Sequence, residues 1–128
     1  MPAPHSPTLQ LHAKSVYDPA ETADGRRVLV TRYWPRGVPR AAVDEYVPAL
    51  APTRELLHAF KDGAMDWGAF RERYLEEMSA PAPRAEIERL AEQAASEPLT
   101  LLCVCREESR CHRSLLRDLV ANAAPREE

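Results

Sequence analysis

The sequence predicts a small single-domain α/β protein, with a sheet of three to four mostly parallel strands and helices on both faces. Segments that resemble strands are separated by segments whose apolar residues have helical spacing, which is the pattern of layered strands and helices. The chain has 128 residues, 45% of them hydrophobic and 29% charged, enough for one hydrophobic core. We therefore expect one domain over residues 9–123, with flexible ends at 1–8 and 124–128.

Three segments are predicted to be strands. Apolar and polar residues alternate over residues 9–17, residues 28–34 are β-branched and aromatic, and residues 99–105 form the most continuous apolar run in the chain. A continuous apolar run is typical of a central strand that is covered on both faces. The second and third strands are separated by enough helix for a right-handed crossover, so we expect them to be parallel. The short loop after the first strand leaves its orientation open.

Five further segments are predicted to be helices, because their apolar residues recur at helical spacing and because proline or a capping residue bounds them. Residues 80–83, which contain two prolines, are interpreted as a linker between two of these helices. The predicted helical segments are 39–47, 52–60, 66–78, 87–94 and 111–123.

Composition and charge favour a cytoplasmic protein that binds a small anion. The three cysteines lie within nine positions of one another, and no signal peptide or apolar stretch of the roughly 18 residues needed to cross a membrane is present. This pattern predicts free thiols in a reducing compartment. The net charge is −3, yet residues 26–40 carry five arginines and no acidic residue. A positive segment in an acidic chain suits an anionic small molecule better than nucleic acid, which stays an alternative partner.

The candidate site follows from topology. Ligands of open α/β sheets bind at the carboxyl ends of parallel strands, and the second and third strands should end at the same edge. Segments that are far apart in the sequence are therefore expected to meet there. The residues predicted to gather at this edge are Arg32, Trp34 and Arg36 from the second strand and Cys103, Cys105, Cys111, His112 and Arg113 from the third.

The turn from the third strand into the last helix carries the predicted chemistry. The first amides of a helix lack intrahelical partners and attract anions, and Arg113 adds charge there. His112 is assigned the role of general acid or base, because it shares the inward face of the helix with leucines. Cys111 and Cys105 are candidate nucleophiles, and the thiol of Cys111 is expected to have a lowered pKa at the helix start. Arg32, Trp34 and Arg36 would complete the binding pocket.

A metal site at this turn is the alternative to the thiol interpretation. Cys105, Cys111 and His112, with Cys103 as a further donor, are suitable ligands for a soft metal ion. Their spacing is not that of a structural zinc site, and adjacent residues on a helix project about 100° apart. We therefore predict no metal and no cofactor, and we interpret Cys103 as a small hydrophobic residue of the central strand.

Several sequence runs resemble the YeaO-like branch of domain of unknown function family 488. The resemblance covers nearly the whole chain, and it implies a small cytoplasmic α/β protein without implying an activity. Thr31 stands where the family usually has aspartate, and Cys105 stands where the larger branch carries an acidic residue. The runs that carry it are VYDPAE at 16–21, DGRRVLV at 24–30, RYWPRG at 32–37, LTLL at 99–102 and, for the larger branch, CHRSL at 111–115.

Three functional hypotheses follow from the sequence. The first is an enzyme whose pocket binds a phosphate- or carboxylate-bearing small molecule. The second is a binding module without turnover, for a nucleotide or a nucleic acid, that uses the arginine-rich segment. The third is a redox switch in which Cys105 and Cys111 form a disulfide. The sequence leaves the oligomeric state open.

Overall fold

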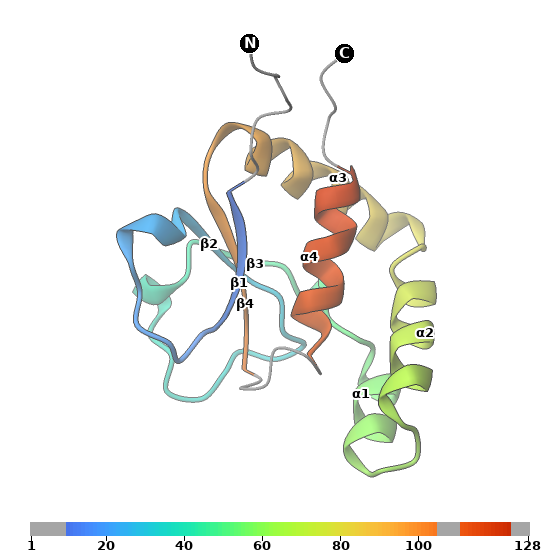
Figure 1. Cartoon of the computed structure of the whole chain (residues 1–128). Helices are drawn as coiled ribbons and strands as arrows, with labels where there is room; N and C mark the ends of the chain where they lie inside the picture. Colours follow the sequence, from blue (N-terminus) through green and yellow to red (C-terminus); the bar gives the residue numbers. More distant parts are fainter. Residues whose placement is uncertain (1–9, 105–110, 124–128) are drawn as a thin grey trace.

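The computed structural model describes residues 10–104 and 111–123, which form a parallel sheet with α-helices packed against it (Figure 1). This arrangement confirms the predicted small α/β fold. The strands are β1 (Leu11–Ser15), β2 (Arg26–Leu29), β3 (Glu45–Tyr46) and β4 (Leu99–Cys103). The helices are α1 (Arg54–Lys61), α2 (Trp67–Glu77), α3 (Pro81–Ser96) and α4 (His112–Ala123), with 3-10 helices η1 (Thr22–Asp24), η2 (Arg40–Ala42) and η3 (Pro48–Leu50).

The sheet has the strand order β1-β4-β2-β3, and every pair in it is parallel. The predicted parallel arrangement of the second and third sequence strands, β2 and β4, is confirmed, and β1 is parallel to β4 as well. All five residues of β4 are buried, as expected for a strand with neighbours on both sides and a layer on each face. The carboxyl ends of β1, β4 and β2 therefore lie at one edge.

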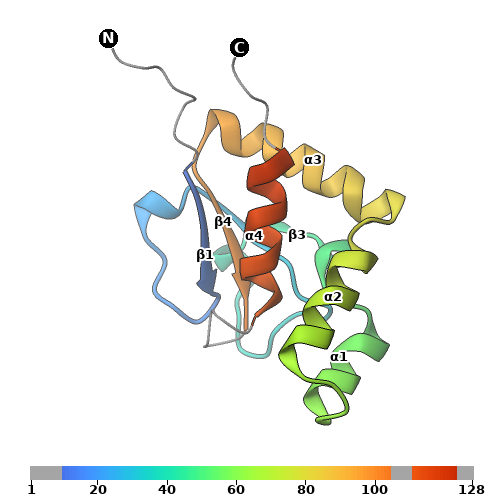
Figure 2. The ribbon, with the colours of Figure 1, turned by 45° about the vertical axis from the view of Figure 1, so that its right-hand side comes forward.

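The two faces of the sheet are covered by different kinds of structure, so the α-helices pack on one face where the sequence predicted helices on both. Leu99, Leu101 and Val28 pack in the main core with residues of all four α-helices, and both ribbon views show these helices gathered on one side of the sheet (Figures 1 and 2). Leu102 and Leu29 point to the other face, where they form a smaller cluster with Val16. The side chains that cover this cluster come from the stretch around η2 and β3, namely Trp34, Val38, Val43 and Tyr46.

The helix predicted over residues 39–47 is wrong. This stretch contains η2 and the strand β3 in place of an α-helix. The amide of Asp44 donates to the carbonyl oxygen of Arg27 at 2.8 Å, and that of Val47 donates to Leu29 at 2.9 Å. Pairing with β2 therefore satisfies the amides that a helix would have bonded internally, and the apolar residues of the stretch divide between the two cores.

The linker predicted over residues 80–83 is also wrong, because α3 begins at Pro81. The first amides of a helix have no intrahelical partner, so prolines are tolerated in the first turn. The starts of α1 and α2 agree with the sequence. The Thr53 side chain caps α1 by accepting from the amide of Leu56, and Asp66 caps α2 by accepting from Ala69 at 2.8 Å.

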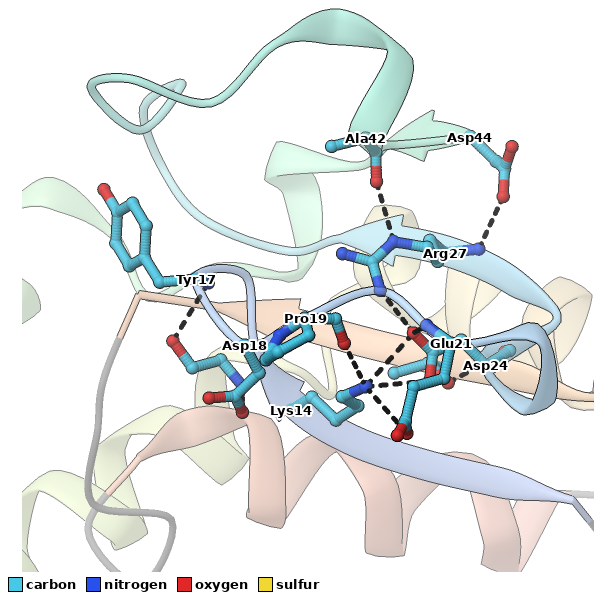
Figure 3. Close-up of polar contacts among 11 residues, drawn as sticks. Lys14, Tyr17, Asp18, Pro19, Glu21, Asp24, Arg27, Ala42 and Asp44 are labelled. Atoms are coloured by element: carbon cyan, nitrogen blue, oxygen red, sulfur yellow. Dashed lines mark hydrogen bonds and ion pairs between the residues drawn. The ribbon is translucent and has the colours of Figure 1, made fainter.

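A buried ionic cluster lies beside β1 and β2 (Figure 3). The Asp24 carboxylate accepts a hydrogen bond from Lys14 Nζ at 2.9 Å and another from Arg27 Nη1, and the Arg27 Nε donates to the carbonyl oxygen of Ala42 at 2.7 Å. Thr100 Oγ1 donates to the backbone carbonyl of Asp24 at 2.8 Å. We call Lys14, Asp24 and Arg27 the ionic cluster; it holds the loop after β1 against β2 and β4.

Hydrogen bonds set the charge state of this cluster. Burial by itself would raise the pKa of Asp24, but the hydrogen bonds from Lys14, from the Glu21 backbone and from Arg27 outweigh it, so the pKa lies below its ordinary value of 3.8. For Lys14, burial would lower the pKa, and the hydrogen bond and charge of Asp24 raise it above 10.5. Both groups are therefore ionised at neutral pH, and they compensate each other's charge.

Gly25 makes the tight turn that follows Asp24. Its φ angle is +64°, which side chains rarely allow, and a Cβ atom there would lie 2.2 Å from the carbonyl oxygen of Pro98. The same carbonyl accepts a hydrogen bond from the amide of Arg26 at 2.9 Å. The glycine thus lets β2 start directly against the residue that precedes β4.

Within residues 10–104 and 111–123, none of the helices combines the length and the apolar character needed to cross a bilayer. The predicted flexible ends at 1–8 and 124–128 lie outside the described residues, as does Cys105.

Candidate thiol–imidazole site

Two thiols and an imidazole meet at the carboxyl edge of the sheet. Cys103 is the last residue of β4, Cys111 directly precedes α4, and His112 is the first residue of that helix. All three are buried, with 1%, 1% and 6% of their surfaces exposed. The end of β4 and the start of α4 lie at the same edge, so residues eight and nine positions apart are in contact. We call these three residues the thiol–imidazole cluster.

The imidazole of His112 is held from one side by backbone. Its Nε2 lies 2.8 Å from the carbonyl oxygen of Val30, the residue that follows β2. A carbonyl oxygen only accepts hydrogen bonds, so Nε2 carries the hydrogen and donates it. In the neutral imidazole, Nδ1 is then left with a lone pair, and it lies 3.8 Å from the Sγ atom of Cys103. The ring is therefore oriented with its basic nitrogen toward sulfur.

The second sulfur extends this arrangement. Cys111 Sγ lies 3.2 Å from Cys103 Sγ. The three groups therefore form a chain of contacts that runs from Cys111 through Cys103 to the imidazole of His112. A nucleophile beside a base, with the base oriented by a third group, is the arrangement that activates nucleophiles in enzymes. Here a carbonyl oxygen takes the orienting role that a carboxylate often has. The cluster is thus suited to moving a proton between sulfur and nitrogen.

Tyr74 of α2 forms the wall beside the imidazole. The centroids of the Tyr74 and His112 rings are 5.5 Å apart in an edge-on arrangement. The Tyr74 hydroxyl donates to the carbonyl oxygen of Leu50 at 2.8 Å. Burial raises the pKa of Tyr74 well above 10.0, and the nearby Cys103, Cys111 and Glu77 raise it further. The hydroxyl therefore stays protonated and has a structural role at this wall.

The predicted binding residues have varied surroundings. The Arg32 guanidinium donates to the carbonyl oxygens of Ala51 and Pro52, each at 3.1 Å. Trp34 donates from Nε1 to Val38 at 2.8 Å, and the Arg40 guanidinium lies 4.9 Å above its ring.

Arg36 and Arg113 differ in exposure. Arg36 has an exposed side chain, and its carbonyl oxygen accepts from the Tyr17 hydroxyl at 3.0 Å. Tyr17 follows β1, so this contact places the Arg36 backbone at the same carboxyl edge. Arg113, the second residue of α4, is buried with 3% of its surface exposed.

Three arginines of the segment 26–40 are engaged inside the molecule. Arg26 pairs with Glu45 at 3.0 Å, while Arg27 belongs to the ionic cluster and Arg32 binds backbone carbonyls. Part of the positive charge that the sequence concentrates here is therefore engaged within the chain, whereas Arg36 and Arg40 are exposed. Of the predicted catalytic residues, the structure brings His112 and Cys111 together, and Cys105 lies outside the described residues.

Cys103 is the residue of this cluster that sequence reasoning treated as hydrophobic. The signal that favours it is its place as the last residue of the central parallel strand, where α/β proteins put ligand-binding groups. The adjacency of Cys111 and His112 in the sequence does not exclude a shared metal ion. Cys111 lies before the helix that begins at His112, so the 100° spacing of helical neighbours does not apply. The donor atoms of Cys103, Cys111 and His112 all lie within 4.8 Å of one another.

The fold and this cluster define a small α/β protein with a buried thiol–imidazole site at the carboxyl edge of a parallel sheet. The chain belongs to the DUF488-N3a family, whose description is "Active DUF488-N3 subclade" and whose model matches residues 11–124.

Relatives of the chain support this assignment. It is 40% identical over 112 residues to the uncharacterized protein YeaO of Escherichia coli K12, covering 86% of this chain and 96% of YeaO. It is 31% identical over 107 residues to the uncharacterized proteins Mb3100c of Mycobacterium bovis and Rv3073c of Mycobacterium tuberculosis, covering 82% of this chain and 88% of each relative. No solved structure matches the chain. The resemblance to the YeaO-like branch is thereby confirmed.

Proposed function

We propose that the protein is an enzyme that binds a phosphate- or carboxylate-bearing small molecule at the carboxyl edge of the sheet and acts on it with the thiol–imidazole cluster. The observation that carries the proposal is the orientation of His112. Its Nε2 donates to Val30 at 2.8 Å while Nδ1 faces the Cys103 sulfur. A histidine that only filled space in the core would not need its basic nitrogen beside a pair of thiols.

The proposed chemistry begins with a proton transfer. His112 Nδ1 accepts the thiol proton of Cys103, and the contact between the two sulfurs lets Cys111 pass its own proton to Cys103. The result is a thiolate on Cys111 and an imidazolium on His112. The macrodipole of α4 stabilises negative charge at Cys111, which directly precedes the helix. Cys111 is therefore the proposed nucleophile, His112 the base, and Cys103 the relay between them.

Anion binding is assigned to groups at the same edge. The first amides of α4 and the Arg113 side chain belong to the start of this helix, and helix starts bind anions. Arg32, Trp34 and Arg36 are proposed to complete the pocket. Tyr17 supports this assignment, because its hydroxyl ties the Arg36 backbone to the end of β1.

The pH dependence of thiol alkylation tests the base. A Cys105→Ser background restricts the reaction with iodoacetamide to Cys103 and Cys111. We expect these thiols to react with a midpoint below the free-thiol value of about 8.5, and His112→Gln to move that midpoint upward by about one unit. His58→Gln, at an exposed position of α1, is the matched control and should change nothing. Equal profiles for His112→Gln and the background would contradict the proposed base.

Protection from alkylation tests the anion pocket, with inorganic phosphate and acetate as probes. Millimolar phosphate or acetate is expected to slow the reaction of Cys111, and Arg36→Met should weaken that protection. Arg71→Met, which removes another exposed arginine in the middle of α2, is the control. If neither phosphate nor acetate changes the alkylation rate in any variant, the proposed anionic ligand is contradicted.

A redox role is favoured by the 3.2 Å separation of the two sulfurs, which involves Cys103 in place of the predicted Cys105. In this alternative, hydrogen peroxide oxidises the two thiols to a disulfide and is itself reduced to two molecules of water. Mass spectrometry of peptides after mild peroxide treatment distinguishes the pairs. A Cys103–Cys111 bridge supports the switch, and two unmodified thiols contradict it.

A further inference from the structure

We propose that Cys103, Cys111 and His112 form a binding site for a divalent transition-metal ion of the zinc class. The inference goes beyond the proposed function, since it assigns a ligand to the cluster and holds whether or not the thiols act on a substrate. It also replaces the sequence expectation that the chain has no metal site. The donor set, the distances between the donors and the orientation of the imidazole support it independently.

The donor set selects the class of metal. Two thiolates and an imidazole are soft or borderline ligands that prefer Zn²⁺ and similar ions, whereas Mg²⁺ and Ca²⁺ prefer carboxylate and carbonyl oxygen. Among residues 10–104 and 111–123, the group of converging donors contains two cysteines and a histidine and no carboxylate. The site is therefore expected to favour zinc, or cobalt as its spectroscopic substitute, over magnesium or calcium.

The distances between donors are close to those of a tetrahedral zinc site. With bonds of about 2.3 Å to sulfur and about 2.0 Å to nitrogen, tetrahedral angles put two sulfurs about 3.8 Å apart and a sulfur and a nitrogen about 3.5 Å apart. Here the two sulfurs are separated by 3.2 Å, and Cys103 Sγ lies 3.8 Å from His112 Nδ1. Small side-chain movements would seat an ion between the three atoms.

The imidazole is already oriented as metal-bound histidines are. Such histidines donate their other ring nitrogen to a carboxylate or a backbone carbonyl, which fixes the tautomer and aims the lone pair at the metal. His112 donates from Nε2 to the Val30 carbonyl oxygen and presents Nδ1 to the sulfurs. Tyr74 packs edge-on against the ring and limits its rotation.

Burial of the thiols is compatible with metal binding. Two buried thiolates would be unfavourable without a compensating charge, and a divalent ion supplies that charge while it displaces both thiol protons. The three residues fill three positions of a tetrahedron. With these three ligands from the described residues, the fourth position would be taken by water or by an anionic molecule bound at the same edge, as in zinc sites with three protein ligands.

Metal titration of the full chain tests the inference. Chelator-treated, reduced protein is titrated with Zn²⁺ by calorimetry and with Co²⁺ by absorption spectroscopy. We expect one ion per chain and a Co²⁺ spectrum with thiolate charge-transfer bands and the strong visible bands of tetrahedral coordination. Cys103→Ser, Cys111→Ser and His112→Gln should each weaken Zn²⁺ binding by at least about 100-fold, more than the 10- to 100-fold that loss of an outer partner costs.

A control variant and a protection assay keep the result interpretable. His58→Gln, at an exposed position of α1, should bind Zn²⁺ as the unchanged chain does. Circular dichroism shows whether each ligand variant folds. If one does not, the unchanged chain still tests the metal site, because one equivalent of Zn²⁺ should block alkylation of both Cys103 and Cys111. Absence of stoichiometric binding, absence of that protection, or binding lost only in Cys105→Ser would each overturn the inference.

The outcomes separate this inference from the proposed function. If alkylation of the metal-free protein depends on His112 but the protein binds no Zn²⁺, the thiol–imidazole chemistry is supported and the metal site is ruled out. Stoichiometric Zn²⁺ binding, together with alkylation of the metal-free protein that ignores His112, does the reverse.

Discussion

The sheet carries two buried polar clusters whose chemistry differs. The ionic cluster of Lys14, Asp24 and Arg27 joins opposite charges that satisfy one another within the chain. The thiol–imidazole cluster joins groups that are neutral in their ordinary state, and its donors converge on one another. The first arrangement needs no outside partner. The second consists of nucleophiles and metal ligands, which is why we assign function to it and structure to the other.

The comparison is sharpened by where each cluster lies. Asp24 ends η1 and Arg27 lies at the start of β2, and the ionic cluster ties the loop after β1 down. Cys103 ends β4, and His112 at the start of α4 bonds to Val30 directly after β2, so both lie at the carboxyl edge where α/β sheets bind ligands. Changes in the ionic cluster should therefore alter stability most. Changes in the thiol–imidazole cluster should alter reactivity and metal binding more than stability.

Asp24→Asn is expected to give the largest loss of stability, about 3 to 5 kcal/mol in the free energy of unfolding, because it leaves buried positive charges without their partner. Urea denaturation followed by circular dichroism measures it. Glu21→Gln is the control, since the Glu21 side chain is 70% exposed and 3.5 Å from Lys14, and it should change the free energy by less than about 0.5 kcal/mol. Similar values for both variants would remove the structural role of the ionic cluster.

Low pH should weaken the ion pairs that Asp24 forms with Lys14 and Arg27. The pKa of Asp24 is lower in the folded chain than its ordinary value of 3.8, so the unfolded state binds the proton more readily. The stabilisation is present above pH 3.8 and is lost as the pH falls through the lower folded value. Urea midpoints are measured between about pH 5 and about pH 2, the range in which carboxylates titrate. As the pH falls, the midpoint should decrease more steeply for the unchanged chain than for Asp24→Asn. Parallel slopes would contradict the lowered pKa.

Gly25→Ala breaks the geometry of the ionic cluster without touching its charges. The new Cβ would lie 2.2 Å from the Pro98 carbonyl oxygen at a φ angle of +64°, and we expect a loss of at least about 2 kcal/mol. Thermal denaturation measures it. Gly63→Ala, also at positive φ but with no atom within 4 Å of the new Cβ, should cost less. Equal losses would show that contact with Pro98 is unimportant.

Tyr74→Phe probes the wall of the thiol–imidazole cluster. It leaves the buried Leu50 carbonyl without the hydroxyl that donates to it at 2.8 Å, so a loss of about 1 to 2 kcal/mol is expected. The ring that contacts His112 remains, so alkylation of Cys111 should change little. A large change in alkylation with unchanged stability would place the hydroxyl in the chemistry of the site.

His112→Gln should have the smallest effect on stability and the largest on reactivity. Loss of the hydrogen bond to Val30 is expected to cost about 1 kcal/mol, well below the loss for Asp24→Asn. Urea denaturation and alkylation of the same sample give both quantities. A loss of stability as large as that of Asp24→Asn would make His112 a structural residue and weaken the distinction between the clusters.

Local sequence patterns predicted the helices and strands better than they predicted the contacts between them. The helical spacing around Phe70 and Tyr74 and the apolar run of β4 were enough to place α2 and the central strand. The helix expected over 39–47 was wrong because its amides pair with β2, and a partner 17 or more positions away leaves no local signal.

The contacts of the candidate site share this long-range character. His112 bonds to Val30 across 82 positions, and topology alone suggested that their segments would meet. Cys103 was interpreted as hydrophobic because a cysteine in a buried strand usually is. The hydrogen bonds from Arg27 and Arg32 to backbone carbonyl oxygens could not be predicted either. A cluster of arginines in a sequence does not reveal which carbonyls and carboxylates will pack against it.

The brevity of β3 has a consequence for self-association. An edge strand exposes unpaired amides and carbonyls on which another chain can add a strand, and long edges are therefore prone to aggregate. β3 ends the sheet with only Glu45 and Tyr46, and Pro48, which has no amide hydrogen, follows almost at once. At this border a second polypeptide finds almost no template, so addition of a further strand is disfavoured on the β3 side of the sheet, in contrast to the longer edge strand β1 on the other side.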